Sequence, residues 1–158
     1  MPTNYLSIDV GSTSVTALII DIDAKSVVGR STIANDATIT SAADKKLGRS
    51  EWDIVRMTDL AITNAASLIK RTQVQPAAIG ITGQQQGLQL LDKDMNTVGS
   101  FISWQDQRSK DTLPNENRTY LDVMGELGGA VTEENGLPAF DNTGCPIVTG
   151  YTAPNLYW

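Results

Sequence analysis

A short polar turn near the start of the chain carries the residue types that bind phosphate groups. It is Gly11-Ser12-Thr13-Ser14, and Asp9 stands just before it at the end of an apolar run. Glycine lets a backbone approach a ligand closely, while the three hydroxyls and the backbone amides can donate hydrogen bonds to phosphate oxygens. An ionised Asp9 carboxylate only accepts hydrogen bonds, which suits a hydrated Mg²⁺ ion. The alternative is an ordinary hairpin turn with no ligand, since short motifs of this kind are loose.

Two later segments place further polar and aromatic side chains directly after strand-like runs. The first is Gln84-Gln85-Gln86, which lies between two glycines, and the second runs from Trp104 to Arg108. Each has a structural alternative. The glutamines could form a polar surface turn, and Trp104 could pack in the core, as a tryptophan after an apolar strand commonly does. Asp106 and Arg108 could pair with each other or with helix ends, and this alternative has the same weight as contact with a substrate.

Composition and charge exclude several classes of protein and of site. The chain has 158 residues, of which 41% are hydrophobic and 19% charged, enough for one domain with a core. Its formal net charge of −6 leaves no broad basic field, so we expect no nucleic-acid partner. The sequence contains no histidine, which excludes Ser-His and Cys-His nucleophile pairs and His-ligated metal sites. Catalysis would have to use carboxylates, amides, hydroxyls, the backbone and a bound ion.

Cysteine content and the N-terminal sequence bear on the location of the protein. The lone cysteine, Cys145, has no partner for an intrachain disulfide. The N-terminus has neither the basic region nor the long apolar core that directs export, and no apolar run is long enough to span a bilayer. These features predict a cytoplasmic protein with no membrane partner, in which Cys145 is an inert thiol in a loop.

The elements that would position these residues follow from the apolar pattern. Strand-like runs rich in branched and aromatic residues lie on both sides of the turn, and a third comes next; they are residues 4–10, 15–21 and 26–34. Apolar residues at steps of three and four predict a helix over 51–70, with Ser50 and Asp53 as a capping box. A short apolar run over 77–82 then predicts a buried strand parallel to one of the first three.

Weaker signals follow, and together the elements define a fold class. They predict strands over 88–91 and 98–104, a short helix over 120–127, and a helix that begins at Thr152 as its N-cap. We therefore predict an α/β fold with a mixed sheet, antiparallel at the first hairpin and parallel at 77–82. The helix packs on one face of this sheet. This order of elements is the start of a ribonuclease H-like core.

Three segments in this order resemble the FGGY family of carbohydrate kinases, which includes glycerol kinase and xylulokinase and belongs to the actin-like ATPase superfamily. They are Ile8 to Ser14, Gly80 to Gly87 and Trp104 to Arg108, with fitting gaps between them. Each segment alone is weak, whereas the three together are fairly specific. The resemblance implies a two-domain enzyme that transfers the γ-phosphoryl group of ATP to a sugar or polyol hydroxyl in the cleft between its domains.

The resemblance also implies roles for individual residues. Asp9 would help to hold Mg²⁺, and the turn from Gly11 to Ser14 would face the phosphates of ATP. Gln84, Gln85 and Gln86 would bind the sugar, because amides donate and accept at once and so match its hydroxyls. Trp104 would offer an apolar face to the C–H surface of the carbohydrate. The other substrate-binding candidates are Asp106 and Arg108.

The sequence departs from the family's pattern within the matched segments. Thr16 stands where relatives often have a lysine or arginine, so we expect one positive contact to the γ-phosphate to be missing. The run Gln84-Gln85-Gln86 is neither the Gln-Met-His of xylulokinase-like members nor the Gln-Arg-Glu of glycerol kinases. The choice of sugar therefore stays open.

The largest departure concerns the family's general base, an aspartate, and its adenosine pocket. The resemblance implies that both come from stretches beyond Trp158. We therefore expect residues 1–158 to be the N-terminal part of the first, sugar-binding domain, without the second domain and inactive alone. The uncovered sheet of an incomplete core would favour a homo-oligomer. Two alternatives stay open: a non-catalytic sugar-binding or regulatory module, and another ATPase of the actin-like superfamily.

Overall fold

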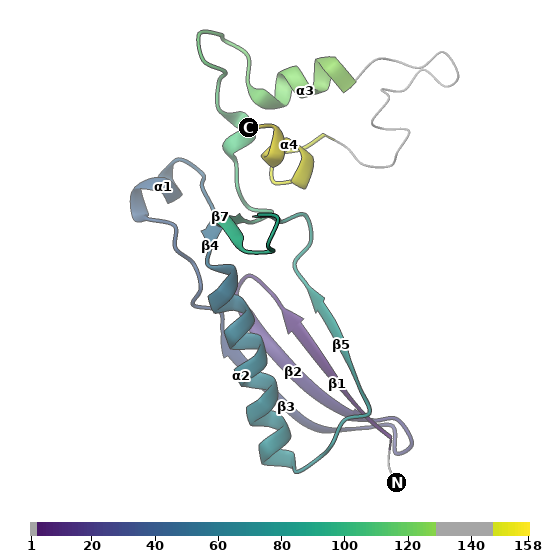
Figure 1. Ribbon diagram of the computed structural model, residues 1–158. Helices are drawn as coiled ribbons and strands as arrows, with labels where there is room; N and C mark the ends of the chain where they lie inside the picture. The colour runs from purple at the N-terminus through teal and green to yellow at the C-terminus, as the bar shows by residue number, and fades with distance from the viewer. Residues whose placement is uncertain (1–2, 129–146) are drawn as a thin grey trace, which may run out of the picture. The chain divides into compact units, whose positions relative to one another are not determined.

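The computed structural model describes residues 3–128 and 147–158, which form two compact units (Figure 1). The first unit contains residues 1–38 and 53–85, and the second contains residues 39–52 and 86–158. The chain therefore passes from one unit to the other at residues 38/39, 52/53 and 85/86. Cys145, which the sequence places in a loop, lies outside the described residues.

The first unit is built on a four-stranded mixed sheet (Figure 1). Its strands lie in the order β3-β2-β1-β5 and are β1 (Asn4–Val10), β2 (Ser14–Asp21), β3 (Ser26–Ala34) and β5 (Ala78–Gly83). Antiparallel pairing joins β1 to β2 and β2 to β3, whereas β5 runs parallel to β1. The four predicted strands are confirmed to within one residue at each end, and so is the mixed pairing.

Helix α2 (Ile54–Thr72) covers one face of this sheet. It begins after Asp53, whose carboxylate accepts hydrogen bonds from the amides of Val55 and Arg56. Its buried side chains form one stripe, as the apolar spacing predicts: Met57, Leu60, Ala61, Asn64, Ala65 and Leu68. The buried apolar residues of β1 and β2 complete this core: Leu6, Ile8, Val15, Ala17 and Ile19.

The prediction that the parallel strand is buried is wrong. All six residues of β5 are exposed, and Ile81 is 75% exposed. β5 is the edge strand of the sheet. Its residues Ile79 and Ile81 pair with Leu6 and Ile8 and so share their face, but α2 packs mainly against β1, β2 and β3. An apolar strand therefore remains uncovered at the edge.

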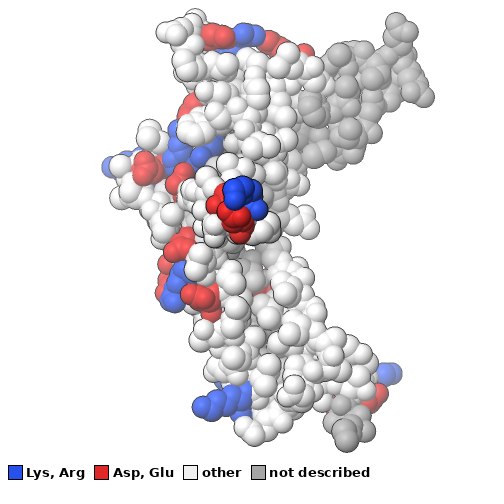
Figure 2. Space-filling model, in the orientation of Figure 1, with Lys and Arg blue, Asp and Glu red and all other residues white. Residues whose placement is uncertain are grey.

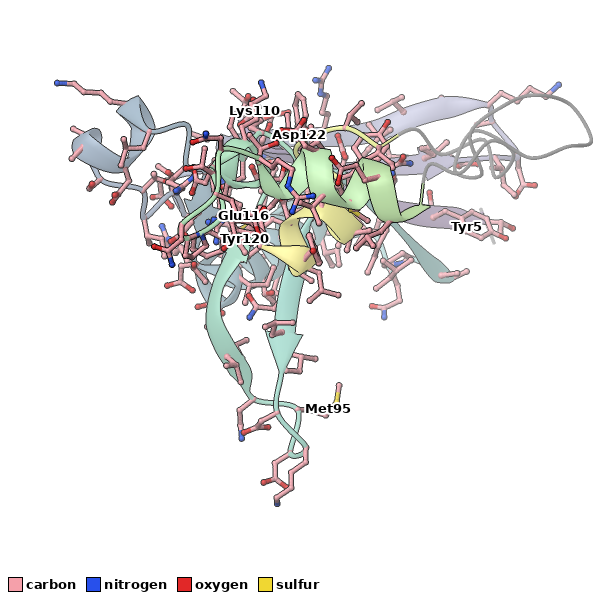
Figure 3. The ribbon with its side chains drawn as sticks, turned by 90° about the horizontal axis from the view of Figure 1, so that it is seen from above. Tyr5, Met95, Lys110, Glu116, Tyr120 and Asp122 are labelled. Atoms are coloured by element: carbon pink, nitrogen blue, oxygen red, sulfur yellow. The ribbon has the colours of Figure 1, made fainter. Side chains whose placement is uncertain are left out.

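The second unit contains a three-stranded antiparallel sheet. Its strands lie in the order β4-β7-β6 and are β4 (Glu51–Trp52), β6 (Leu88–Leu91) and β7 (Thr97–Ile102). Figure 3 shows Met95 in the turn that joins β6 to β7. The helical elements are α1 (Ala42–Lys46), the 3₁₀ helix η1 (Arg108–Lys110), α3 (Tyr120–Gly128) and α4 (Thr152–Tyr157). α3 and α4 meet through Tyr120 and Tyr157, whose ring centroids are 6.0 Å apart.

Three predictions at the helix starts are corrected. The capping box at Ser50 is wrong, because the Ser50 hydroxyl lies 2.7 Å from that of Ser103 and Asp53 alone caps α2. Residues 51 and 52 form β4 instead of a first helical turn. Thr152 is the first residue of α4, and Tyr151 takes the N-cap position. Helix α1 was not predicted; it begins after Ser41, whose hydroxyl accepts from the Asp44 amide at 3.1 Å.

The face of the molecule shown in Figure 2 carries mixed charge. On this face, acidic and basic side chains lie next to each other in small clusters, and large uncharged areas separate these clusters. Among residues 3–128 and 147–158, no helix has the length and apolar character needed to cross a lipid bilayer.

Candidate active site

Asp9 stands near the carboxyl end of β1, on the sheet face opposite α2. Side chains alternate along a strand, so Leu6 and Ile8 point toward the helix and Asp9 points away from it. Its neighbours in the sheet are Thr16 on β2 and Thr82 on β5, which place two hydroxyls on the same face. The Asp9 side chain is exposed and makes no hydrogen bond to any residue that the structure describes. The strand register thus presents a free carboxylate.

The turn from Gly11 to Ser14 joins β1 to β2. The Gly11 amide donates to the Ser14 carbonyl at 3.0 Å and closes the turn. A Cβ atom at Gly11 would lie 3.1 Å from that carbonyl oxygen, so glycine fits best here. Within residues 3–128 and 147–158, the turn's side-chain hydroxyls have no hydrogen-bond partner; they belong to Ser12, Thr13 and Ser14. These hydroxyls are available to a ligand.

Asn35 contacts this turn, although no motif in the sequence indicates a role for it. It follows β3 and is 8% exposed. Its side-chain amide donates to the Gly11 carbonyl at 2.8 Å, and its backbone amide donates to the Thr13 carbonyl at 3.0 Å. The available signal was weak: a polar residue ends a strand at the same end of the sheet as the turn.

The glutamine run begins where β5 ends. The Gln84 backbone amide donates to the Val10 carbonyl at 3.1 Å, so the parallel ladder continues to the start of the turn. The Gln84 side-chain amide is buried and has no hydrogen-bond partner among the described residues. Gln85 is exposed. Gln86 has a left-handed backbone with a φ of 62° and is the first residue of the second unit on this side.

Trp104 lies in the second unit, in the loop after β7. It is 47% exposed, so the alternative that it packs in the core is not favoured. Gly150 packs closely against the backbone of Trp104: a Cβ atom at Gly150 would lie 1.9 Å from the Trp104 carbonyl oxygen, and the φ of +84° at Gly150 also suits glycine. The indole of Trp104 remains accessible.

Asp106 is fully buried and accepts four hydrogen bonds from the protein. Its Oδ1 accepts from the backbone amide and from Nε of Arg108, both at 2.8 Å. Its Oδ2 accepts from the Ser50 amide at 2.7 Å and from Arg108 Nη2 at 3.0 Å. Arg108 also pairs with Glu51. This geometry favours the alternative in which Asp106 and Arg108 pair with each other.

The ionisation of this pair follows from the same contacts. Burial opposes the charged form of Asp106, yet the hydrogen bonds from Arg108 and from the Ser50 amide outweigh it and hold its pKa below the usual value. Burial likewise opposes the charge on Arg108, but hydrogen bonds to Asp106 and Glu51 raise its pKa. Both side chains are therefore charged at neutral pH.

The indole of Trp158 lies over this cluster. The guanidinium carbon of Arg108 is 4.8 Å from its ring centroid, and that of Arg49 is 5.5 Å away. The indole N–H donates to Asp111 at 2.9 Å, and Asp111 forms an ion pair with Arg49. Trp158 thus combines cation–π contacts with a hydrogen bond.

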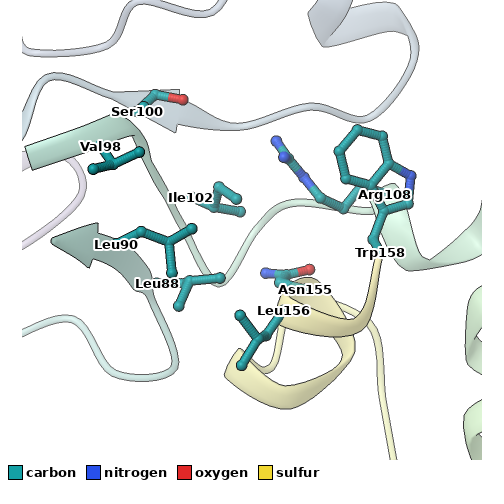
Figure 4. A pocket seen from close by; sticks show the side chains of 10 residues that line it. Leu88, Leu90, Val98, Ser100, Ile102, Arg108, Asn155, Leu156 and Trp158 are labelled. Atoms are coloured by element: carbon teal, nitrogen blue, oxygen red, sulfur yellow. The ribbon is translucent and has the colours of Figure 1, made fainter. Parts of the chain in front are cut away.

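A cavity of about 360 Å³ lies within the second unit beside this cluster (Figure 4). Apolar side chains of β6, β7 and α4 form much of its wall: Leu88, Leu90, Val98, Ile102 and Leu156. Asn155 also lines it, is 3% exposed, and has a side-chain amide with no hydrogen-bond partner among the described residues. Of the predicted substrate-binding residues, Arg108 alone reaches this cavity.

The predicted site residues fall into two groups, one in each unit. The first unit brings Asp9, the turn and Gln84 to one end of its sheet through the pairing of β1 with β5, and Gln85 follows as its last residue. The second unit carries the other group: Gln86, Trp104, Asp106 and Arg108.

The oxygen groups around Asp9 fit a magnesium ion that keeps most of its water. Mg²⁺ prefers oxygen ligands and usually takes one or two carboxylates together with substrate phosphates. In the part of the chain that the structure describes, no three His, Cys, Asp or Glu side chains gather to hold a metal by themselves. Asp9 supplies one carboxylate, and Thr16 and Thr82 supply hydroxyl oxygens next to it, so this set suits a magnesium ion that also binds substrate phosphates.

The sequence matches a known protein family over most of its length. Residues 4–158 match the family described as "FGGY family of carbohydrate kinases, N-terminal domain". A curated relative, the xylulose kinase of Haemophilus influenzae, is 28% identical over 157 residues, which cover 98% of this chain and 29% of the relative. The chain thus spans less than a third of that relative's length.

Solved structures show the same fold. A xyloylose kinase from Brucella ovis is 26% identical with a TM-score of 0.70, and the match covers 97% of this chain and 28% of that one. The xylulose kinase from Bifidobacterium adolescentis is 17% identical with a TM-score of 0.65, covering 98% and 28%. These neighbours have the actin-like ATPase fold, so the predicted ribonuclease H-like α/β fold is confirmed.

Proposed function

Because the chain belongs to the FGGY family of carbohydrate kinases, we propose that it is the N-terminal part of the sugar-binding domain of a two-domain kinase. That kinase would transfer the γ-phosphoryl group of ATP to a hydroxyl of a sugar or polyol. One structural observation carries the proposal: an open turn, Gly11 to Ser14, stands beside the free carboxylate of Asp9. The match to 29% of the H. influenzae relative supports a longer parent protein.

The phosphates of ATP would bind at the turn. The hydroxyls of Ser12, Thr13 and Ser14 would donate to phosphate oxygens, and Asp9 would hold Mg²⁺ directly or through water. Bound Mg²⁺ supplies positive charge that offsets the charge on the transferring phosphoryl group. Thr16 adds no positive charge, and its hydroxyl lies 3.0 Å from that of Thr32. The turn's donors would therefore carry more of the γ-phosphate binding than in relatives with a lysine or arginine here.

Gln84, Gln85, Gln86 and Trp104 would bind the sugar. A buried amide without a partner costs roughly 1–3 kcal/mol, so the unpaired Gln84 amide supports a ligand whose hydroxyls both donate and accept. The accessible indole of Trp104 supports stacking against the C–H face of a sugar ring.

Asp106 and Arg108 would act on the sugar site indirectly. The two side chains form an ion pair with each other; Asp106 also accepts a hydrogen bond from the Ser50 amide, and Arg108 also pairs with Glu51. Fixed in this way, they would hold in place the loop that carries Trp104.

Phosphoryl transfer needs more than this chain contains. The sugar oxygen forms a bond to the γ-phosphorus as the bond to the β–γ bridging oxygen breaks, and a base takes the hydroxyl proton. We propose that this base, an aspartate, and the adenosine pocket belong to the rest of the kinase. The 158-residue chain alone would then be inactive.

Family membership argues against the alternative of another ATPase of the actin-like superfamily. The second candidate is a non-catalytic sugar-binding or regulatory module. The observation that favours it is Thr16, an uncharged residue next to Asp9 in the sheet, where the family resemblance leads us to expect a lysine or arginine.

Two further features of the proposal concern assembly and location. The exposed edge strand β5 offers unpaired backbone groups to another strand, which supports self-association of the chain. A lone cysteine and the need for ATP support a cytoplasmic location.

The test is phosphorylation by the full-length protein. ADP formation would be measured with ATP, Mg²⁺ and a panel of sugars and polyols, with the 158-residue chain as an inactive control. Turnover of at least one substrate supports the kinase. Nucleotide binding without turnover of any substrate supports the non-catalytic module, and the absence of nucleotide binding rejects the phosphate-binding role of the turn.

A further inference from the structure

Asn35 connects the end of β3 to the turn from Gly11 to Ser14. Its Nδ2 donates to the Gly11 carbonyl at 2.8 Å, and its backbone N–H donates to the Thr13 carbonyl at 3.0 Å. Its Oδ1 accepts from the backbone amide of Ala37 at 3.2 Å. One end of the buried side-chain amide is thus anchored on the following backbone, and the other end holds the turn.

These bonds determine where two N–H groups of the turn point. A trans peptide unit is planar, and its C=O and N–H groups point in opposite directions. The Gly11 carbonyl shares a peptide unit with the Ser12 N–H, and the Thr13 carbonyl shares one with the Ser14 N–H. Because Asn35 holds both carbonyls toward itself, both N–H groups point away from it.

We propose that Asn35 is a positioning residue for phosphate binding, which fixes the peptide units that present the Ser12 and Ser14 N–H groups to the phosphates of ATP. This inference rests on the proposed kinase function. Asn35 does not touch the nucleotide and acts through the turn. Donors that are already oriented bind an anion without first paying the entropy of ordering the loop.

The side-chain type determines how much of this arrangement survives a substitution. Asparagine both donates and accepts, so it bridges Gly11 and Ala37. Aspartate would keep the bond from the Ala37 amide but could not donate to Gly11, and its charge would repel the Gly11 carbonyl and the phosphates. Alanine would remove both bonds. The backbone hydrogen bond to Thr13 survives either change. We therefore expect nucleotide affinity to fall only in part, because the Ser12 N–H loses its fixed orientation and the Ser14 N–H keeps it.

The test compares Asn35→Ala and Asn35→Asp with wild type in the full-length protein. Steady-state kinetics give KM for ATP and for the sugar, and titration calorimetry gives Kd for ADP. We expect Asn35→Ala to raise KM for ATP and Kd for ADP about tenfold, as for one lost hydrogen bond, with the sugar KM changed by less than about twofold. Asn35→Asp should weaken nucleotide binding further, because it adds repulsion.

Asn64 provides a matched control. It is 3% exposed on α2, and its Nδ2 donates to the carbonyls of Val15 at 3.1 Å and Ser31 at 3.2 Å. It is therefore a second buried amide that donates hydrogen bonds to backbone carbonyls of the same sheet, but to none of the turn residues 11–14. Asn64→Ala should lower the melting temperature while leaving KM for ATP within about twofold of wild type.

The outcomes separate this inference from the proposed function. Weaker nucleotide binding in the Asn35 variants, but not in Asn64→Ala, supports the positioning role. Unchanged nucleotide affinity in the Asn35 variants, or an equal loss in Asn64→Ala, overturns it while the proposed function stands. If Asn35→Ala does not fold, Asn35→Asp decides, because it keeps the Ala37 anchor. Absence of ADP binding by wild type rejects the proposed function and this inference with it.

Discussion

Replacing Asp106 with asparagine should destabilise the protein far more than its small change in size suggests. If Oδ1 keeps its two bonds from Arg108, the new NH₂ group faces two donors, the Ser50 amide and Arg108 Nη2. Two hydrogen bonds are then lost, and among the described residues Glu51 is left as the carboxylate paired with the buried guanidinium of Arg108. Breaking one partner out of a buried ion pair costs about 3–5 kcal/mol, more than the roughly 1 kcal/mol of an average hydrogen bond.

Urea unfolding of the purified chain, followed by tryptophan fluorescence, measures this loss, since Trp158 lies over the cluster. Asp106→Asn should lower the free energy of unfolding by about 3–5 kcal/mol. The control is Asp94→Asn, which removes the exposed pair with Lys93 and should change stability by less than about 0.5 kcal/mol. A loss below about 1 kcal/mol for Asp106→Asn, the size of one ordinary hydrogen bond, would refute the reasoning.

Acid titration gives a second measure of the same interaction. The pKa of Asp106 lies below 3.8, the ordinary value of an aspartate, so the folded state favours its charged form. Such a group stabilises the fold above its unfolded pKa, and its contribution is lost as the pH falls through its folded pKa. The stability difference between wild type and Asp106→Asn should be largest above about pH 5 and shrink in more acidic solution. A difference that stays constant down to pH 3.8 and below would contradict the lowered pKa.

Three further substitutions test the proposed site and the exposed edge. In the full-length kinase that we propose, Asp9→Asn should lower kcat at least about 100-fold, because the metal that this carboxylate would hold stabilises the charge of the transferring phosphoryl group. Near-normal kcat in steady-state kinetics would reject this role. Trp104→Ala should raise the sugar KM about tenfold and leave the ATP KM unchanged, and equal rises in both would contradict a sugar contact. For the 158-residue chain, Ile81→Lys should shift the mass measured by size-exclusion chromatography with light scattering toward that of the monomer. A lysine on an edge strand disfavours pairing with a strand of another molecule. A wild-type chain that is already monomeric would remove the basis for self-association.

The parts of the fold that could be predicted are those whose signal is local. Branched residues between turn signals located β1, β2, β3 and β5, and the spacing of apolar residues located α2. The burial of β5 could not be predicted, because it depends on which element covers a strand, and α2 packs mainly over the other three. Ser50 was misassigned for a similar reason: its partner, Ser103, is 53 residues away.

In the candidate site, too, the residues that could be predicted are those whose partners are close in the sequence. Asp9 and the turn from Gly11 to Ser14 could be proposed from a short motif, since the groups involved are adjacent in sequence. The contact of Asn35 with Gly11 spans 24 residues and has no motif. For Asp106 and Arg108 the sequence left pairing and substrate contact open, and the bond from the Ser50 amide, 56 residues away, shows that Asp106 is part of a buried network.

The interleaving of the two units in the chain has a consequence for synthesis and for dissection. On the ribosome, the hairpin of β1 and β2 emerges long before its parallel partner β5, so the first unit cannot close its sheet until residue 83 has been made. Residues 39–52 likewise cannot pack into the second unit until its other residues, from 86 onward, have been made. No single cut releases either unit as a continuous piece. An experimenter who wants the first unit, with its turn from Gly11 to Ser14, must excise residues 39–52, join residue 38 to residue 53, and end the gene after residue 85.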